Sequence, residues 1–390
     1  MQPIAIHADR ALTPFEEIFD AVVVLQGSRI LEVGRRGQIV LPRGAREITM
    51  KGASIVPGFV DVHIHGAGGH DVMEGTTEAL EIIAATVARH GTTSFVATTV
   101  TASEIETRES VAGMARFILN ASQYAVRERS AEILGIHFEG PFISPARRGV
   151  HPVEWIVPPS TAFLAQLLKE SRGTAQIVTL APELPGALEL IAAARQAGLV
   201  VSLGHTNANY EQAQAAIDAG ATHAAHVFNA MRPFSHRDTG VIGAVMTSPK
   251  VSAELIADGI HVDQAAMRML VDLKTPERVI LVSDGTSATG MPDGKYQLGK
   301  FSVKVSGGVC RNAEGKLAGS TLTLDCALRN IVALGVPLPS ALRMLTANPA
   351  RQIGLGSRKG VLAAGADADL VFLDDKLEIS AVMTRGAGLE

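Results

Sequence analysis

The sequence has little cysteine, no long apolar run and no excess of charge of either sign. Its two cysteines, Cys310 and Cys326, are too few for a disulfide framework and indicate reduced thiols in the cytoplasm. No apolar run approaches the roughly 18 residues needed to cross a bilayer, and the first residues, MQPIAIHADR, show no signal peptide. A net charge of -4 with interspersed signs predicts no nucleic-acid and no membrane partner. We therefore expect a globular cytoplasmic protein.

What is present is enough apolar material for a large core, arranged in two kinds of pattern. Hydrophobic residues make up 47% of the 390, which exceeds the usual length of one domain. Residues 1–56 consist of short strand candidates, with 21–25 and 29–33 flanking a turn at 26–28, and the tail after residue 360 returns to turns and strands. We expect residues 1–56 and 355–390 to form one small β-sandwich domain beside a catalytic domain at 57–354.

The central part alternates short apolar strands with helical stretches. Leu80, Ile83, Ala84 and Val87 show the i, i+3, i+4, i+7 spacing of an amphipathic helix. Parallel strands need such crossovers and bury both faces, so the pattern predicts a (β/α)8 TIM-type barrel, with a doubly wound open sheet as the alternative. The strand candidates are 59–64, 94–99, 133–138, 176–181, 199–204, 222–227, 251–257 and 279–283.

Polar residues recur where these strands end, which is where a barrel of this type carries its active site. In "PGFVDVHIHG" the period of two in a strand puts His63 and His65 on one face. Imidazole and carboxylate groups together suit Zn²⁺ or Fe²⁺ at roughly 2.0–2.2 Å. Such a pair alone can also be two ordinary strand-end histidines, and the metal interpretation depends on four further strand ends, at Glu139, His205, His226 and Asp284.

Several longer segments match a known family and occur in its order from residue 57 to residue 371. They include "PGFVDVHIHG", "GIHFEGPFISPARRGVH", "LGHTNA", "THAAHVFNAM", "IADGIHVD", "LVSDG", "LAGSTLT" and "GVLAAGADADLV". The chain resembles the amidohydrolase superfamily and, within it, the N-acetylglucosamine-6-phosphate deacetylases. "HFEGPF", "HVFNAM" and "ADGIHVD" are specific to the deacetylases, whereas the "GVLAAGADADLV" tail marks only the superfamily.

The resemblance implies a role for each site residue. Glu139, His205 and His226 would hold the main divalent metal, zinc or iron. His63 with His65 leaves room for a second ion bridged by Glu139, so the resemblance implies one or two ions per subunit. Asp284 would be the general base and acid, and His151 would polarise the acetyl carbonyl. The substrate-binding residues implied are Val150, His151, Asn229, Ala230, Arg237, Asp258, Gly259, Ile260, His261, Leu317, Ala318, Gly319 and Ser320.

The activity implied is hydrolysis of the amide of N-acetyl-D-glucosamine 6-phosphate, giving D-glucosamine 6-phosphate and acetate. A metal-bound hydroxide would attack the carbonyl, with Asp284 moving the protons. The family also implies a homodimer in which Arg237 reaches the partner's site. The alternatives are another amidohydrolase activity (an N-acyl-D-amino-acid deacetylase, a deaminase or a cyclic amidase) and a metal-free scaffold protein.

Overall fold

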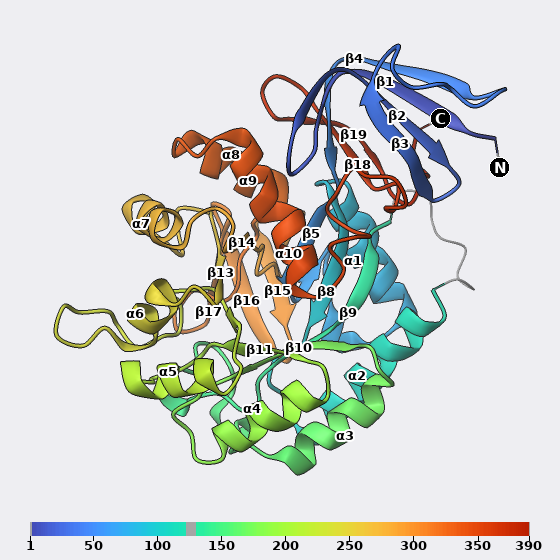
Figure 1. Ribbon diagram of the computed structural model, residues 1–390. Coiled ribbons are helices and arrows are strands. Elements are labelled where there is room, and N and C mark those ends of the chain that lie inside the picture. The colour runs from blue at the N-terminus through green and yellow to red at the C-terminus, as the bar shows by residue number, and fades with distance from the viewer. Residues whose placement is uncertain (1, 122–129, 390) are drawn as a thin grey trace.

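Eight parallel strands form the central barrel of the protein. The computed structural model describes residues 2–121 and 130–389 (Figure 1). The strands are hydrogen-bonded in the order β14-β13-β12-β11-β10-β9-β8-β5, and a parallel bridge from Ile64 to Gly285 joins the two ends. The expected (β/α)8 barrel is therefore confirmed, and the alternative of a doubly wound open sheet is not observed among the described residues. Its strands are β5 (Phe59–Ile64), β8 (Thr92–Thr98), β9 (Glu132–Glu139), β10 (Ala175–Leu180), β11 (Val200–Leu203), β12 (His223–Ala224), β13 (Ser252–Leu255) and β14 (Val279–Leu281).

The barrel forms because its strands are apolar on both faces and helices cover the outer one. Every residue of β5, β8, β12, β13 and β14 is buried. In α1 the four residues of the helical pattern are buried, and Thr76 caps its first turn by accepting a hydrogen bond from the N–H of Ala79. The helices are α1 (Thr77–Ala88), α2 (Glu104–Leu119), α3 (Thr161–Ser171), α4 (Ala187–Gln196), α5 (Tyr210–Asp218), α6 (Gly240–Thr247), α7 (Gln264–Lys274), α8 (Leu324–Ala333), α9 (Leu338–Leu345) and α10 (Ala347–Gln352).

A small antiparallel sheet is inserted after the last barrel strand. It consists of β15 (Gly294–Leu298), β16 (Phe301–Ser306) and β17 (Val309–Asn312). Its turn is tied to the first βα loop, because Asp71 accepts a hydrogen bond from the N–H of Gly299 at 2.8 Å. The two-stranded ribbon β6 (Gly66–Ala67) and β7 (His70–Asp71) belongs to that loop.

Both ends of the chain build a second sheet at one side of the barrel (Figure 1). One continuous sheet forms this β domain, in the order β19-β18-β4-β1-β2-β3, and the hairpin expected around residues 26–28 joins β2 to β3. The domain boundaries at residues 57 and 355 stay a prediction. Within the described ranges, no helix has both the length and the apolar character that a membrane span requires. The strands are β1 (Ile4–Leu12), β2 (Glu17–Gln26), β3 (Arg29–Arg35), β4 (Arg46–Pro57), β18 (Leu370–Leu373) and β19 (Ile379–Met383).

A network of ion pairs connects the barrel strand β9 to the residues just before β18. Lys359 is 1% exposed, and its Nζ lies 2.6 Å from Glu132, 2.8 Å from Asp367 and 2.7 Å from Asp369. Burial would lower the pKa of Lys359, but the carboxylates of Asp369, Glu132 and Asp367 outweigh it and raise the pKa. The ammonium therefore stays charged and holds three acidic groups together.

Replacing Lys359 with methionine is expected to destabilise the fold. The change removes the cation shared by two buried carboxylates, Asp367 and Asp369, and by the half-buried Glu132. Breaking a buried pair in this way costs about 3–5 kcal/mol of unfolding free energy. Thermal denaturation followed by circular dichroism should show a lowered Tm. Lys250→Met is the matched control, because the Lys250 side chain is 65% exposed, and its Tm should stay near the wild-type value. Equal Tm values for the two variants would contradict this role of Lys359.

Candidate active site

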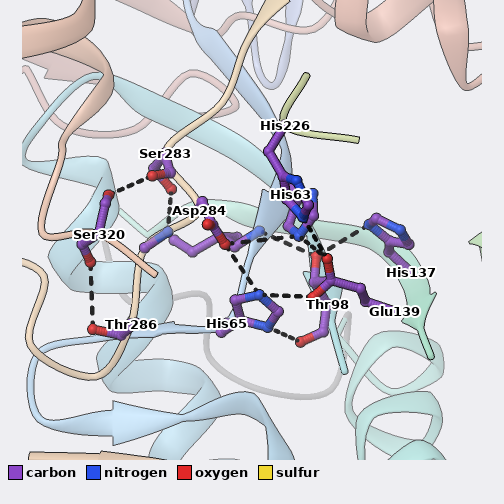
Figure 2. Close-up of polar contacts among 12 residues, drawn as sticks. His63, His65, Thr98, His137, Glu139, His226, Ser283, Asp284, Thr286 and Ser320 are labelled. Atoms are coloured by element: carbon purple, nitrogen blue, oxygen red, sulfur yellow. Dashed lines mark hydrogen bonds and ion pairs between the residues drawn. The ribbon is translucent and has the colours of Figure 1, made fainter. Parts of the chain in front are cut away.

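The predicted ligands and the predicted base lie together at the carboxyl ends of the barrel strands. Parallel strands end on one face of a barrel, so side chains that follow different strands meet there. Figure 2 shows five of them pointing toward one another. His63 and His65 are at the end of β5, Glu139 is the last residue of β9, His205 and His226 follow β11 and β12 by two residues, and Asp284 follows β14 by three.

One oxygen of Glu139 is the centre of the cluster. Its Oε1 lies 2.9 Å from Nε2 of His226, 3.1 Å from Nε2 of His205 and 3.3 Å from Nε2 of His63. All four side chains are buried. In a tetrahedral site with ligand bonds of about 2.1 Å, neighbouring ligand atoms are ~3.4 Å apart. The spacing of these nitrogen and oxygen atoms is therefore close to that of a filled coordination shell.

The second oxygen of Glu139 extends the cluster toward the pocket. Its Oε2 lies 3.3 Å from Nε2 of His65 and 3.5 Å from Nε2 of His151. His65 also approaches Asp284, with Nε2 3.2 Å from Oδ1. Three overlapping groups within the described residues bring potential ligand atoms close enough to share an ion: His63, His65 and Asp284; His63, Glu139 and His226; Glu139, His151 and His205.

The carboxylates of the cluster are held in their charged form. Burial would raise the pKa of Glu139, but His63, His205 and His151 outweigh it and bring the pKa well below its usual value. Burial likewise opposes ionisation of Asp284, and His65 with His63 lowers its pKa nevertheless. Burial would also lower the pKa of His65, yet Asp284 and Glu139 raise it to about 10. The site therefore has a strong attraction for positive charge.

In their neutral form, three histidines would present an unprotonated Nε2 to this centre, because their Nδ1 atoms face acceptors. The Nδ1 of His65 donates to the carbonyl of Thr98 at 3.0 Å, and that of His205 donates to the carbonyl of Arg147 at 3.1 Å. The Nδ1 of His63 lies 2.8 Å from the carboxylate of Glu254. A neutral imidazole carries one proton, so placing it on Nδ1 leaves the Nε2 lone pair for a metal.

His151 has the opposite arrangement. The backbone N–H of Thr101 donates to Nδ1 of His151 at 3.2 Å, so this nitrogen is the acceptor of the ring. The proton of neutral His151 is then on Nε2, which points into the pocket toward Glu139. This ring is suited to donate a hydrogen bond to a bound molecule and is less suited to be a metal ligand.

One atom of the cluster fits a metal ion directly. The Nε2 of His63 is fully buried and has no hydrogen-bond partner among the described residues, although a buried polar atom without one is rare. It faces Oε1 of Glu139 at 3.3 Å and Oδ1 of Asp284 at 3.8 Å. A cation between these groups would satisfy all three atoms, so the donor set fits a divalent metal.

The backbone is strained where three of these residues leave their strands. His205, His226 and Asp284 have φ values of 47°, 25° and 48°, in the region that residues with a side chain rarely adopt. Such conformations cluster at active sites, where the surrounding structure enforces them. The turns direct all three side chains back over the barrel mouth.

A pocket opens above the cluster, and about half of the predicted substrate residues line it. Val150, His151, Asn229, Ala230, His261, Leu317 and Gly319 are in its wall, together with Val100 and Leu298. Asp258, Gly259 and Ile260 are not in the wall, but Asp258 accepts a hydrogen bond from the Nδ1 of His261 at 2.6 Å and so orients that ring. Ala318 and Ser320 are buried behind the wall, where Ser320 donates to the carbonyl of Ser283.

Arg237 lies away from the pocket of its own chain. It is exposed on the loop before α6, which projects from the body of the protein (Figure 1). Arg232 and Asp238 fix the base of this loop, because two nitrogens of Arg232 donate to one oxygen, Oδ2 of Asp238, at 2.8 and 2.5 Å.

Sequence reasoning missed the groups behind the ligands. Glu254 contacts His63, and Thr98 and Thr101 fix the rings of His65 and His151. One signal could have found Glu254, because it is the single charged residue in the apolar segment "VSAELIA". The two threonines act partly through backbone groups, which no side-chain pattern reveals.

Comparison with known proteins gives consistent relatives over the whole chain. A sequence model described as the Amidohydrolase family matches residues 54–387. An N-acetylglucosamine-6-phosphate deacetylase of Lysinibacillus sphaericus is 36% identical over 358 residues, which cover 91% of this chain and 90% of the relative. An N-acetylgalactosamine-6-phosphate deacetylase of Escherichia coli O157:H7 is 38% identical over 341 residues, or 87% and 89% of the two chains.

Solved structures agree with these relatives. A mutant N-acetyl-D-glucosamine-6-phosphate deacetylase of Mycobacterium smegmatis, in complex with N-acetyl-D-glucosamine-6-phosphate, superposes with a TM-score of 0.92 at 38% identity and covers 100% of this chain and 99% of its own. The N-acetylglucosamine-6-phosphate deacetylase of Thermotoga maritima superposes with a TM-score of 0.87 at 30% identity over 99% of each chain.

Proposed function

We propose, on the premise that this chain belongs to the amidohydrolase family and to its N-acetylglucosamine-6-phosphate deacetylases, that it hydrolyses N-acetyl-D-glucosamine 6-phosphate to D-glucosamine 6-phosphate and acetate. The observation that carries the proposal is the buried carboxylate of Glu139 with five histidine Nε2 atoms within 3.5 Å. Asp284 adds a second carboxylate at the wall of the same pocket.

The cluster and the family indicate a divalent metal, and the proposal assigns its ligands. Glu139, His205 and His226 would hold the main ion, and His63 with His65 would allow a second one. A zinc or iron ion there supplies a Lewis acid for the carbonyl and for water. The fixed Nδ1 contacts of His65 and His205 support this assignment.

Asp284 is the proposed proton carrier. Its carboxylate is ionised, because His65 and His63 outweigh the effect of burial and lower its pKa. The side chain lines the pocket, and hydrogen bonds hold its backbone in place. The N–H of Asp284 donates to the carbonyl of His63 at 2.9 Å, and its carbonyl accepts from the N–H of Ser320 at 2.7 Å. It takes a proton from the attacking water and delivers it to the departing amine nitrogen.

His151 is proposed to stabilise the acetyl carbonyl. Its Nε2–H is aimed into the pocket by the contact between Nδ1 and the N–H of Thr101, so it needs no reorientation when negative charge develops on the oxygen. Leu317 and Gly319 would border the acetyl group, with Ala318 and Ser320 buried behind them, and Val150 lies beside His151 in the wall.

The sugar phosphate is assigned to the outer part of the pocket. Asn229, Ala230 and residues 258–261 are proposed to bind it, with His261 presented by its contact to Asp258. Arg237 is proposed to reach the phosphate from a second copy of the chain, which makes the active form a homodimer. Sedimentation of the purified protein tests the dimer, and the proposed cytoplasmic location is tested by cell fractionation.

The phosphate gives the experiment that tests the function. Acetate release should be much faster from N-acetyl-D-glucosamine 6-phosphate than from the unphosphorylated sugar, and Arg237→Ala should raise KM for the phosphorylated sugar by about 10- to 100-fold, the value of one charged hydrogen bond. His236→Ala changes the exposed neighbour of Arg237 and should leave KM unchanged. Equal rates on both sugars would count against this substrate and favour another amidohydrolase activity.

A second candidate substrate is the galactosamine epimer. The 38% identity to an N-acetylgalactosamine-6-phosphate deacetylase equals or exceeds that to the other relatives named above. Competition between the two N-acetylhexosamine 6-phosphates in one assay, with kcat/KM as the measure, decides which epimer the pocket prefers. A metal-free scaffold is disfavoured by the complete set of ligand atoms around Glu139.

A further inference from the structure

Glu254 is a fully buried carboxylate that the proposed chemistry leaves unused. It lies in β13, next to β12 and β14 in the barrel, and its side chain is 0% exposed. Three N–H groups surround it. Its Oε2 is 2.8 Å from Nδ1 of His63 and 2.9 Å from the backbone nitrogen of His226, and its Oε1 is 2.7 Å from Nε2 of His223.

The contacts of Oε2 both lead to the proposed ligands. Accepting from Nδ1 of His63 fixes the ring rotation and the tautomer, so that the buried Nε2 faces Glu139 at 3.3 Å. Accepting from the backbone N–H of His226 helps to hold that residue at its φ of 25°. One oxygen atom therefore orients a histidine of the first strand and a histidine of the sixth.

The contact of Oε1 serves another purpose. His223 is in none of the three groups of potential ligands among the described residues, and its ring contacts the far oxygen of Glu254. It satisfies the carboxylate and prevents it from rotating away from His63. His223 therefore offers a way to perturb the same buried network without touching a ligand.

We propose that Glu254 is a positioning residue that acts through His63 and so sets the affinity of the cluster for the metal ion that His63 contacts. The proposal rests on the metal-dependent function proposed above. Partners of this kind behind metal-binding histidines typically change metal affinity by about 10- to 100-fold. Oε2 of Glu254 contacts His63 and His226, whereas Oε1 contacts His223. Because only Oε2 faces proposed ligands, a positioning role can be distinguished from a general need to pair buried polar groups.

Glu254→Met tests the proposal, because methionine keeps the approximate volume and removes both acceptors. Metal affinity is measured by chelator competition and by elemental analysis after dialysis, and the absorption of the Co²⁺-loaded protein reports the geometry of the site. We expect Glu254→Met to lower metal affinity by about 10- to 100-fold and to reproduce the loss caused by His63→Gln. The double variant should bind metal no more weakly than His63→Gln alone.

His223→Gln is the matched control, since its amide can still donate to Oε1 of Glu254, and it should keep wild-type metal affinity. Three results would overturn the proposal: unchanged affinity in Glu254→Met, an equal loss in His223→Gln, or additive losses in the double variant. Acetate release by the wild-type protein is measured separately, so failure of the proposed function is seen independently of the metal data.

If Glu254→Met does not fold, the wild-type protein still decides the question. The ¹⁵N spectrum of histidine-labelled protein should contain an Nδ1-protonated ring whose signal is missing from His63→Gln. An Nε2-protonated ring at that position would overturn the proposal, because Glu254 would then not present the Nε2 lone pair of His63 to the metal.

Discussion

Asp284→Asn is expected to lower kcat for acetate release by about 10²- to 10⁴-fold, the usual contribution of a positioned general acid or base. The amide keeps the size of the side chain, but it cannot take a proton from water and return it to the amine. The backbone of Asp284 is pinned by hydrogen bonds to His63 and Ser320, so the side chain should stay aimed into the pocket. The measurement is kcat at saturating substrate on protein of known metal content.

The control for this variant separates proton transfer from loss of structure. Asp325→Asn changes another buried aspartate, which lies in α8 outside the pocket. Asp325 pairs with Arg329 of the same helix and with His90. It should retain kcat even if its Tm falls. A metal-loaded Asp284→Asn protein that released acetate at the wild-type rate would exclude Asp284 as the proton carrier.

The barrel could be predicted from the sequence because each of its eight strands is a short apolar segment, separated from the next by a helical stretch or a turn. The first strand was predicted with its observed bounds, 59–64, and the others within a few residues. The largest difference is the sixth strand, expected at 222–227 and limited to His223–Ala224. The chain turns there because His226 takes a positive φ, and a pattern of apolar residues carries no sign of such a turn.

The site residues that lie at the carboxyl ends of barrel strands could be predicted from the sequence. The period of two placed His63 and His65 on one face, and the polar residues that follow the other strands converge at the mouth of the barrel (Figure 2). His151 was obtained only from the family resemblance, since it lies in a loop with no periodicity. Its orientation depends on the N–H of Thr101, 50 residues earlier in the chain.

The partners of the ligands depend on which strands become neighbours in space. Glu254 and His63 are 191 residues apart, and their contact crosses the interior of the barrel. The segment inserted after β14 forms a sheet in which β17 pairs with β16, and Leu298 and Leu317 from this region line the pocket. Local sequence predicts a strand, but not which pocket it will border.

Glu139→Gln is expected to have the second large effect, which is loss of the metal itself. Five histidine Nε2 atoms lie within 3.5 Å of the two oxygens of Glu139. The amide has no charge, and one of its two terminal atoms is a donor that would face nitrogen lone pairs. Since even a partner behind a ligand changes metal affinity by about 10- to 100-fold, removal of the shared ligand should lower it by more than about 100-fold, and acetate release should fall with it.

Glu132→Gln is the matched control, because it changes a half-buried carboxylate at the other end of the same strand, where Glu132 contacts Lys359 rather than the histidines. It should lower Tm while metal content and kcat stay near the wild-type values. Elemental analysis of both variants after dialysis gives the comparison. If Glu139→Gln retained its metal, or if Glu132→Gln lost as much, the metal would not depend on the shared oxygens of Glu139. The ligands would then have to be sought in the group of His63, His65 and Asp284, which is the set of potential ligands that does not include Glu139.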